Sequence, residues 1–329
     1  MPFDLKELFS FIAFVITTLI FVTVESFINA CKWGFKKRRD LSREVILVTG
    51  AGGGIGRLLC VEFAKCCPTV VAWSHHQSKL EDTARLVLEK TGVIIKTYAC
   101  DIRSRESIRQ TAQRVLDEVG TVTILVNNAG ILNAKRLMAL EQSEIEDCFK
   151  INVISNFYII QEFLPSMMGV KSKEDTPSSV ALAKGHIVTV ASVSSVIPCV
   201  GYSDYSASKA AVLSMSESLE MELALMNLDR KIRMTNVLPF VVNTEMTAGL
   251  KAKRPFLFPF IDAEYCAHRI VNAVRANERT VYITAQYSIL PLLKWLCPAV
   301  TFRRMLNYVG AQEFADNIQE GRAKKVTTL

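Results

Sequence analysis

From residue 44 onward, short apolar runs rich in β-branched residues alternate with longer stretches of helical character. A parallel strand must be followed by a long crossover, so this alternation is typical of a parallel sheet covered on both faces. We therefore predict one α/β domain built on a single doubly wound parallel sheet of about seven strands, with helices on both faces. The expected strands are Val45–Thr49, Thr69–Trp73, Val93–Tyr98, Thr123–Asn127, Gly185–Ala191, Ile232–Leu238 and Thr280–Ile283.

The first expected strand runs directly into TGAGGGIGRLL, in which Gly50, Gly54 and Gly56 are spaced as GxxxGxG. Glycine lets a backbone turn tightly and approach a pyrophosphate, and the helix that begins there offers free N–H groups and the positive end of its dipole. A glycine cluster alone could be an ordinary turn. Its position between the first strand and the first helix favours a dinucleotide site of Rossmann type.

A second motif, GYSDYSASKAA, places Tyr205 and Lys209 four residues apart, on one face of a helix. A tyrosine with a pKa of about 10 is a poor acid or base at neutral pH unless a nearby cation stabilises its phenolate. Lys209 is placed to do so, and Tyr202 could reach the same face. An isolated pair of this kind would more often be an exposed tyrosine and lysine.

The pair is not isolated. GHIVTVAS ends an expected strand at Ser192, and LVNNAG (125–130) ends the fourth strand, where such a sheet reverses its strand order and binds its ligand. FKINV supplies Asn152 in the following helix. With these motifs in order along residues 44–285, the chain resembles the classical short-chain dehydrogenase/reductase family.

The resemblance implies reversible hydride transfer between a nicotinamide and an alcohol or carbonyl carbon. It makes Tyr205 the acid/base and Lys209 the residue that lowers its pKa and holds the nicotinamide ribose. Ser192 then steadies the substrate oxygen and Asn152 is a relay residue, with Ser192 and Tyr205 contacting the substrate. The implied cofactor contacts are Gly50, Gly54, Ile55, Gly56, Ser74, His75, Asp101, Ile102, Asn128, Ala129, Gly130, Tyr205, Lys209, Pro239, Val242 and Thr244. For Asp101, a loop-capping role is the alternative to an adenine contact.

The end of the second strand bears on the choice of cofactor. An acidic residue there would bind the ribose hydroxyl of NAD and repel the 2′-phosphate of NADP, but the position holds Ser74. His75, Lys79 and Arg57 are candidate phosphate partners. We expect NADP(H) to be preferred, with NAD(H) also usable. Adjacent histidines point to different sides, so we expect no metal site at His75 and His76; two solvated histidines on a loop are the alternative.

Residues 8–24 contain no charge, proline or glycine, and these seventeen residues reach the lower limit for spanning a bilayer core of about 30 Å. Basic residues gather at 32–39, which places the following chain on the cytosolic side. A cleaved signal peptide is the alternative, but it would carry its positive charges upstream. We expect an uncleaved anchor with its basic flank over 1–40, a catalytic domain over 41–285 and an amphipathic extension over 286–329.

Composition agrees with this placement. The nine cysteines include no CxxC pair and suit a reducing compartment. The net charge of +7 is modest and concentrated in the basic flank, so we expect no nucleic-acid partner. The expected location is the endoplasmic reticulum membrane or a lipid-droplet surface, and membrane lipid is an expected partner. The family resemblance also implies a homo- or hetero-oligomer.

The anchor and the stretch TNVLPFVVNTEM (235–246) resemble a membrane-bound group of retinoid and 17β-hydroxysteroid dehydrogenases within the family. Pro239-Phe240, where the wider family has Pro-Gly, is similar to the retinal reductases of that group. The resemblance implies reduction of all-trans-retinal to retinol. A 17β-hydroxysteroid or a long-chain aldehyde or alcohol is the alternative substrate. An alternative of another class is a membrane or lipid-droplet surface protein with little turnover. The long polar connection at 169–185 departs from the group.

Two further segments concern the substrate and the membrane. We expect the substrate wall at 246–260, where Phe256, Leu257, Phe258 and Phe260 would form a lipophilic lining; packing on the core or contact with lipid is the alternative. Residues 287–306 mix Trp295, Lys294, Arg303 and Arg304 with apolar residues. We expect a second, interfacial membrane contact there, and a terminal helix packed on the domain or a partner is the alternative.

Overall fold

The computed structural model describes residues 38–170, 183–251, 253–254 and 259–327. The chain divides into two compact units, Met1–Arg39 and Asp40–Leu329. The predicted anchor and Phe256, Leu257 and Phe258 lie outside the described residues, as does most of the polar connection. In the described ranges, every helix is either too short or too polar to cross a membrane.

Seven parallel strands form one sheet, in the order β3-β2-β1-β4-β5-β6-β7. The strands are β1 (Val45–Thr49), β2 (Thr69–Ser74), β3 (Lys96–Ala99), β4 (Ile124–Asn127), β5 (Gly185–Val190), β6 (Ile232–Pro239) and β7 (Thr280–Ile283). The strand order reverses between β1 and β4, as the doubly wound prediction requires. The predicted single parallel sheet is therefore confirmed.

One strand boundary was predicted wrongly. The apolar run at 93–95 was expected to open the third strand, but pairing with β2 begins at Lys96, opposite Val71. Ile95 is buried whereas Ile94 is 79% exposed, so the run lies ahead of the strand as a partly exposed connection. Apolar composition reports burial, while the ends of a strand depend on where its neighbour pairs with it.

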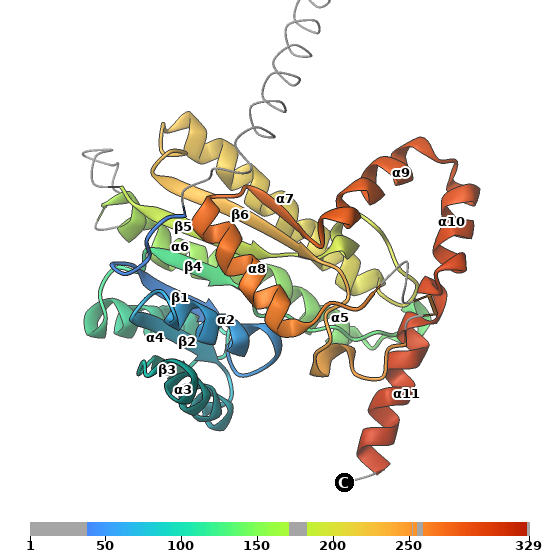
Figure 1. The fold of residues 1–329 in the computed structure, drawn as a ribbon, viewed down its shortest axis with the longest axis horizontal. Helices are drawn as coiled ribbons and strands as arrows, with labels where there is room; N and C mark the ends of the chain where they lie inside the picture. Colours follow the sequence, from blue (N-terminus) through green and yellow to red (C-terminus); the bar gives the residue numbers. More distant parts are fainter. Residues whose placement is uncertain (1–37, 171–182, 252, 255–258, 328–329) are drawn as a thin grey trace, which may run out of the picture. The chain divides into compact units, whose positions relative to one another are not determined.

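Helices cover both faces of the sheet, as predicted (Figure 1). One face is covered by α2 (Gly54–Ala64), α3 (Gln77–Thr91) and α8 (Ala263–Ala276), whose buried side chains share one hydrophobic cluster with the sheet. The other is covered by α4 (Arg105–Glu118), α6 (Ser155–Met168) and α7 (Ser203–Leu225), which pack in a second cluster. The central strands are apolar on both sides because both of their faces are buried.

Two further groups of helices border the carboxyl ends of the strands. Helix α5 (Gln142–Phe149) continues into α6 through a π-helical segment, Lys150–Ile154. After β7 come α9 (Leu290–Leu296), α10 (Ala299–Tyr308) and α11 (Phe314–Thr327), drawn in red in Figure 1. Residues Phe314, Ala315 and Ile318 of α11 pack with Leu132 and Tyr202 from the loops above the sheet. The C-terminal helices therefore contribute to the surroundings of the site.

Candidate active site

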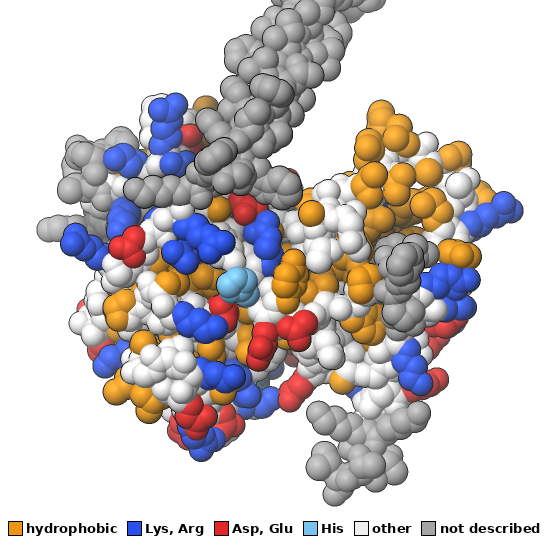
Figure 2. Space-filling view, viewed as in Figure 1, with side chains coloured by type: hydrophobic (Ala, Val, Ile, Leu, Met, Phe, Trp, Pro, Cys, Tyr) orange, Lys and Arg blue, Asp and Glu red, His pale blue; other side chains and the backbone are white. Residues whose placement is uncertain are grey.

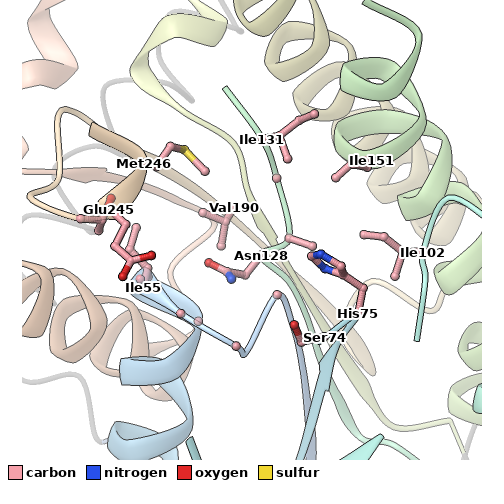
Figure 3. A pocket seen from close by; sticks show the side chains of 18 of the residues that line it. Ile55, Ser74, His75, Ile102, Asn128, Ile131, Ile151, Val190, Glu245 and Met246 are labelled. Carbon is pink, nitrogen blue, oxygen red and sulfur yellow. The ribbon is translucent and has the colours of Figure 1, made fainter. Parts of the chain in front are cut away.

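A cavity of about 490 Å³ opens at the carboxyl ends of the strands, where the strand order reverses. All but one of the predicted catalytic and cofactor residues line it; Asn152 does not belong to its lining. Figure 3 shows Ser74, His75 and Ile102 on one side of this cleft and Glu245 and Met246 on another. The motifs that are scattered along the sequence thus meet in one place.

The loops after β1 and β4 are joined where they diverge. The Thr49 hydroxyl accepts the backbone N–H groups of Asn128 and Ala129 at 3.0 and 3.1 Å. The Asn128 side chain donates to the Thr49 carbonyl at 2.9 Å. These bonds fix the floor of the cleft between its two halves.

The glycine-rich turn fits a bound pyrophosphate. Gly53 is the N-cap of α2, so no capping side chain covers the first N–H groups of that helix. A Cβ placed on Gly53 would meet no described atom within 4 Å, whereas one on Gly56 would overlap the carbonyl oxygen of Gly50. Gly53 thus keeps space open above the helix N-terminus, and Gly56 permits the turn itself. The prediction named Gly50, Gly54 and Gly56 but missed Gly52 and Gly53, although the run of three glycines was visible.

Tyr205 lies in the first turn of α7 and lines the cleft. A hydrogen bond joins its hydroxyl to that of Ser192. The Ser194 hydroxyl donates to Ser192 Oγ at 2.8 Å, and the Ser194 N–H donates to the same atom at 3.1 Å. Burial raises the pKa of Tyr205 to about 12, and the bond with Ser192 opposes that rise. Sequence reasoning missed Ser194, which orients the serine beside the tyrosine.

Lys209 is buried one turn further along α7, with 4% of its surface exposed. Its ammonium donates to the carbonyl oxygen of Val190 at 2.8 Å and lies 5.8 Å from the centroid of the Tyr205 ring. Burial lowers the pKa of Lys209 to about 8. The four-residue spacing predicted a cation beside the phenol, and Lys209 lies there. The hydrogen bond of its ammonium, however, goes to Val190 of β5 and not to Tyr205.

Asn152 lies behind the cleft, in the π-helical segment. Its side chain accepts the N–H of Ile131 at 2.8 Å and donates to Ser208 Oγ at 2.9 Å. Its backbone carbonyl accepts a bond from Asn156 Nδ2 at 2.8 Å. Asn152 therefore ties the loop after β4 to α7 beside Lys209. The sequence located the residue but not the π-helical turn that aims it.

The end of β2 forms the other part of the cleft. The expectation that His75 and His76 point to different sides is wrong, because their rings lie against each other at a tilt of 43°, with centroids 3.7 Å apart. Burial, and after it the charge of His76, lowers the pKa of His75. Arg57 donates to the Gly52 carbonyl at 2.7 Å and to Thr83 at 3.1 Å. Lys79 lines the cleft. Of the phosphate partners that the sequence suggested, Lys79 thus lines the cleft, whereas Arg57 is bonded to the backbone of the glycine turn.

Asp101 and Arg103 also line this part of the cleft. The Arg103 guanidinium donates to both carboxylate oxygens of Asp101, at 2.8 and 3.0 Å, and holds the pKa of Asp101 below its ordinary value. Arg103 was not among the predicted residues. Only its proximity to Asp101 along the chain could have suggested it.

A smaller apolar chamber of about 90 Å³ adjoins the cleft. Ser192, Tyr205, Phe240, Met246 and Thr247 line both spaces, so the hydroxyl pair stands at their junction. The remaining wall includes residues of the C-terminal segment: Leu290, Leu306, Val309, Ala311 and Phe314. The predicted wall at 246–260 contributes Met246 and Thr247, and Phe260 packs nearby in the third hydrophobic cluster. Sequence reasoning missed the contribution from beyond residue 285.

In the described ranges, no group of His, Cys, Asp and Glu side chains is arranged to hold a metal ion.

Comparisons with known proteins agree with this geometry. The family model for short chain dehydrogenases matches residues 44–255. Epidermal retinol dehydrogenase 2 of Mus musculus is 31% identical over 290 residues, which cover 88% of this chain and 89% of the relative. Short-chain dehydrogenase/reductase 3 of Homo sapiens is 34% identical over 276 residues, covering 83% and 86%.

Solved structures share the fold. A short chain dehydrogenase from Burkholderia cenocepacia, solved in complex with NADP, aligns with a TM-score of 0.64 at 22% identity and covers 82% of this chain and 99% of that chain.

A dinucleotide-type cleft that is lined by a partly buried tyrosine and serine and by a buried lysine defines a nicotinamide-dependent oxidoreductase of alcohols and carbonyls. The chain belongs to the short-chain dehydrogenase/reductase family, as the sequence motifs predicted, and its relatives include retinol dehydrogenases.

A matched pair of substitutions tests the glycine turn. Gly53→Ala adds a methyl group only to the cleft, so we expect unchanged thermal stability and an NADPH dissociation constant raised at least about tenfold. Gly56→Ala forces the methyl group against the Gly50 carbonyl and should lower the Tm by several degrees. Fluorescence titration with NADPH and calorimetry separate the two effects. Equal NADPH affinity in Gly53→Ala and the parent would contradict the assignment.

Proposed function

We propose that this protein reduces a lipophilic aldehyde, all-trans-retinal in the first place, to the corresponding alcohol with NADPH as the hydride source. The observation that carries the proposal is the position of Tyr205 and Ser192, where the dinucleotide-type cleft meets an apolar chamber. A carbonyl group can reach the hydroxyl pair from the chamber side while its hydrocarbon part stays out of water.

The residues divide the chemistry among themselves. NADPH, when bound, supplies the hydride. The Ser192 hydroxyl, oriented by Ser194, holds the carbonyl oxygen, and Tyr205 delivers the proton to that oxygen as negative charge develops. The raised pKa of Tyr205 keeps its phenol protonated at neutral pH, which suits the direction of reduction. The Lys209 ammonium stabilises the phenolate that remains.

The shape of the chamber supports a slender substrate. Its volume of about 90 Å³ is well below the roughly 300 Å³ at the lower end of ordinary ligand pockets. A substrate of some twenty carbons must therefore extend out of the chamber or move its walls. A polyene chain has a narrow cross-section, whereas a fused steroid is wide throughout, so the chamber favours retinal over a 17-ketosteroid. The names of the retinol dehydrogenase relatives point the same way.

Tyr205→Phe tests whether the protein is an enzyme. The substitution removes the proton donor but keeps the ring, so we expect kcat for retinal reduction to fall by at least about a thousandfold while NADPH binding persists. Tyr158→Phe is the control, because it removes a hydroxyl from a partly buried tyrosine of α6 that does not line the cleft or the chamber. The surface-protein alternative gains if the parent shows no turnover with retinal, a 17-ketosteroid or a fatty aldehyde, and the cellular effect survives in Tyr205→Phe.

We further propose that NADP(H) is preferred over NAD(H). Ser74 at the end of β2 adds no negative charge to the cleft, and Lys79 and Arg103 line the cleft near this strand end, whereas Lys209 lines it beside Tyr205. In this fold the residue at the end of the second strand faces the ribose, and an acidic residue there would repel the 2′-phosphate of NADP. With Ser74 in that place, the phosphate can lie against Lys79 and Arg103. His75 adds little charge at neutral pH because its pKa is lowered.

Ser74→Asp tests the cofactor preference. A carboxylate here should repel the phosphate and accept the ribose hydroxyl, shifting the ratio of kcat/KM for NADPH over NADH by about a hundredfold toward NADH. Ser78→Asp adds the same charge in the first turn of α3 and is the control for net charge. An unchanged ratio in Ser74→Asp would refute this account of the strand end.

The membrane is the expected setting for the reaction, at the endoplasmic reticulum or a lipid droplet. Beyond the predicted anchor, Figure 2 shows hydrophobic side chains gathered over α9 and α10. Trp295, Leu296 and Ile289 are 82%, 61% and 53% exposed. Arg303 and Arg304 on α10 are also exposed. Exposed apolar residues beside arginines suit a lipid interface with anionic headgroups.

Vesicle flotation tests this second contact. The protein lacking residues 1–39 should float with vesicles that contain phosphatidylserine, and Trp295→Glu combined with Leu296→Glu should abolish flotation because both charges would enter lipid. Ile94→Glu places a charge on an equally exposed apolar residue outside α9 and α10 and should float like the parent. Complete loss of flotation in the truncated parent would instead leave the anchor as the sole attachment.

A further inference from the structure

Two polar side chains of helix α11 donate hydrogen bonds to the loop after β4. The Arg322 guanidinium donates to the carbonyl oxygens of Asn133 and Leu132 at 2.9 and 2.8 Å. Gln319, almost one turn earlier, donates to the carbonyls of Asn133 and Ala134 at 2.8 and 3.1 Å. Three consecutive carbonyls of one loop are thus held by one face of a helix nearly 190 residues away in sequence.

The same guanidinium reaches a second loop. A longer contact of 3.5 Å joins Arg322 Nη2 to the carbonyl oxygen of Met246. Leu132 and Met246 both line the apolar chamber, and they belong to the two different loops that Arg322 contacts. The guanidinium therefore spans the chamber's rim, and its rigid planar fork fixes the separation of its anchoring points.

Further hydrogen bonds connect the loop after β4 to the residue that precedes Tyr205. The Asn133 side chain donates to the Asp204 carboxylate at 2.7 Å and to the carbonyl of Glu144 at 3.1 Å. Asp204 is buried and immediately precedes Tyr205 on α7. A shift of the loop after β4 would thus displace the start of α7, which carries Tyr205, the proposed proton donor.

Backbone packing holds α11 against the second loop independently of any charge. Gly321 and Gly249 meet so closely that a Cβ on either would overlap the Cα of the other, and Gly249 has φ +91°. Two glycines therefore let the helix touch the loop backbone directly beside Arg322. The Arg322 contacts and the glycine contact are separate observations that place α11 on the same pair of loops.

We propose that Arg322 is a positioning residue whose contacts with the loops after β4 and β6 set the width of the apolar chamber, and that α11 thereby determines which lipophilic substrates fit. The inference rests on the proposed function for the nature of the substrate. It follows from the size of the chamber, since a space smaller than its substrate is sensitive to the spacing of its walls. Arg322 touches loop backbone and acts through Leu132, Met246 and Asp204.

Hydrogen exchange and kinetics of Arg322→Ala, Arg322→Lys and Gly321→Ala test the proposal in the full-length protein. Amides of residues 131–134 and 246–250 should exchange at least about tenfold faster in Arg322→Ala and Gly321→Ala. Arg322→Lys keeps one charged donor and should be intermediate. The ratio of kcat/KM for retinal over octanal should change about tenfold, mainly through KM, with the KM for NADPH within about twofold of the parent.

Arg136→Ala is the matched control. Its ion pair with Asp316 also joins the loop after β4 to α11, at 2.8 Å, but on exposed surface. It should leave exchange and the substrate ratio unchanged. Parent-like exchange in both Arg322→Ala and Gly321→Ala, or equal effects in Arg136→Ala, would overturn the proposal. A parent with no turnover would defeat the proposed function, while the exchange measurement would still decide whether α11 sets the loops.

Discussion

The site depends on the contact between Thr49 and the residues after β4. At this point the chain leaves β1 toward one side of the sheet and β4 toward the other, so the loops separate and open a cleft. The hydroxyl and carbonyl of Thr49 satisfy three polar groups of Asn128 and Ala129 exactly where the separation begins. Without that junction, the glycine turn and the loop that leads to Leu132 would have no common floor, and the two halves of the cleft could move independently.

Burial then acts on Tyr205 and Lys209, the proposed catalytic pair, in opposite directions. The low-dielectric interior raises the pKa of the Tyr205 phenol and lowers that of the Lys209 ammonium, because it penalises the charged form of each. The two pKa values, which are nearly equal in water, therefore move apart, to about 12 for the phenol and about 8 for the ammonium. At neutral pH the phenol therefore stays protonated while the lysine keeps its charge, and the Val190 carbonyl holds the ammonium in place.

The sequence predicted the sheet and its switch point from local patterns, and the family resemblance that those patterns support supplied most of the residues of the cleft. The glycine turn, the asparagine pair after β4 and the tyrosine–lysine spacing each combine a strand end with a specific residue type. The π-helical turn at Asn152, the bond from Ser194 to Ser192 and the hold of Arg322 on Asn133 depend on side-chain direction or on contacts distant in sequence. Periodicity carries no signal for these features. The exposure of Ile94 was missed for a related reason: a run of β-branched residues has the same composition whether or not a neighbouring strand pairs with it.

The C-terminal helices wall the apolar chamber although the family model ends at residue 255. The chamber is therefore built partly by the matched family region and partly by the segment that follows it. Under the proposed function, changes in α9 to α11 would alter the fit of the substrate while Ser192, Tyr205 and Lys209 stay unchanged, so two descendants with the same motifs could differ in metabolic role. In proteins with this arrangement, sharing the family motifs and sharing a substrate are therefore separate questions.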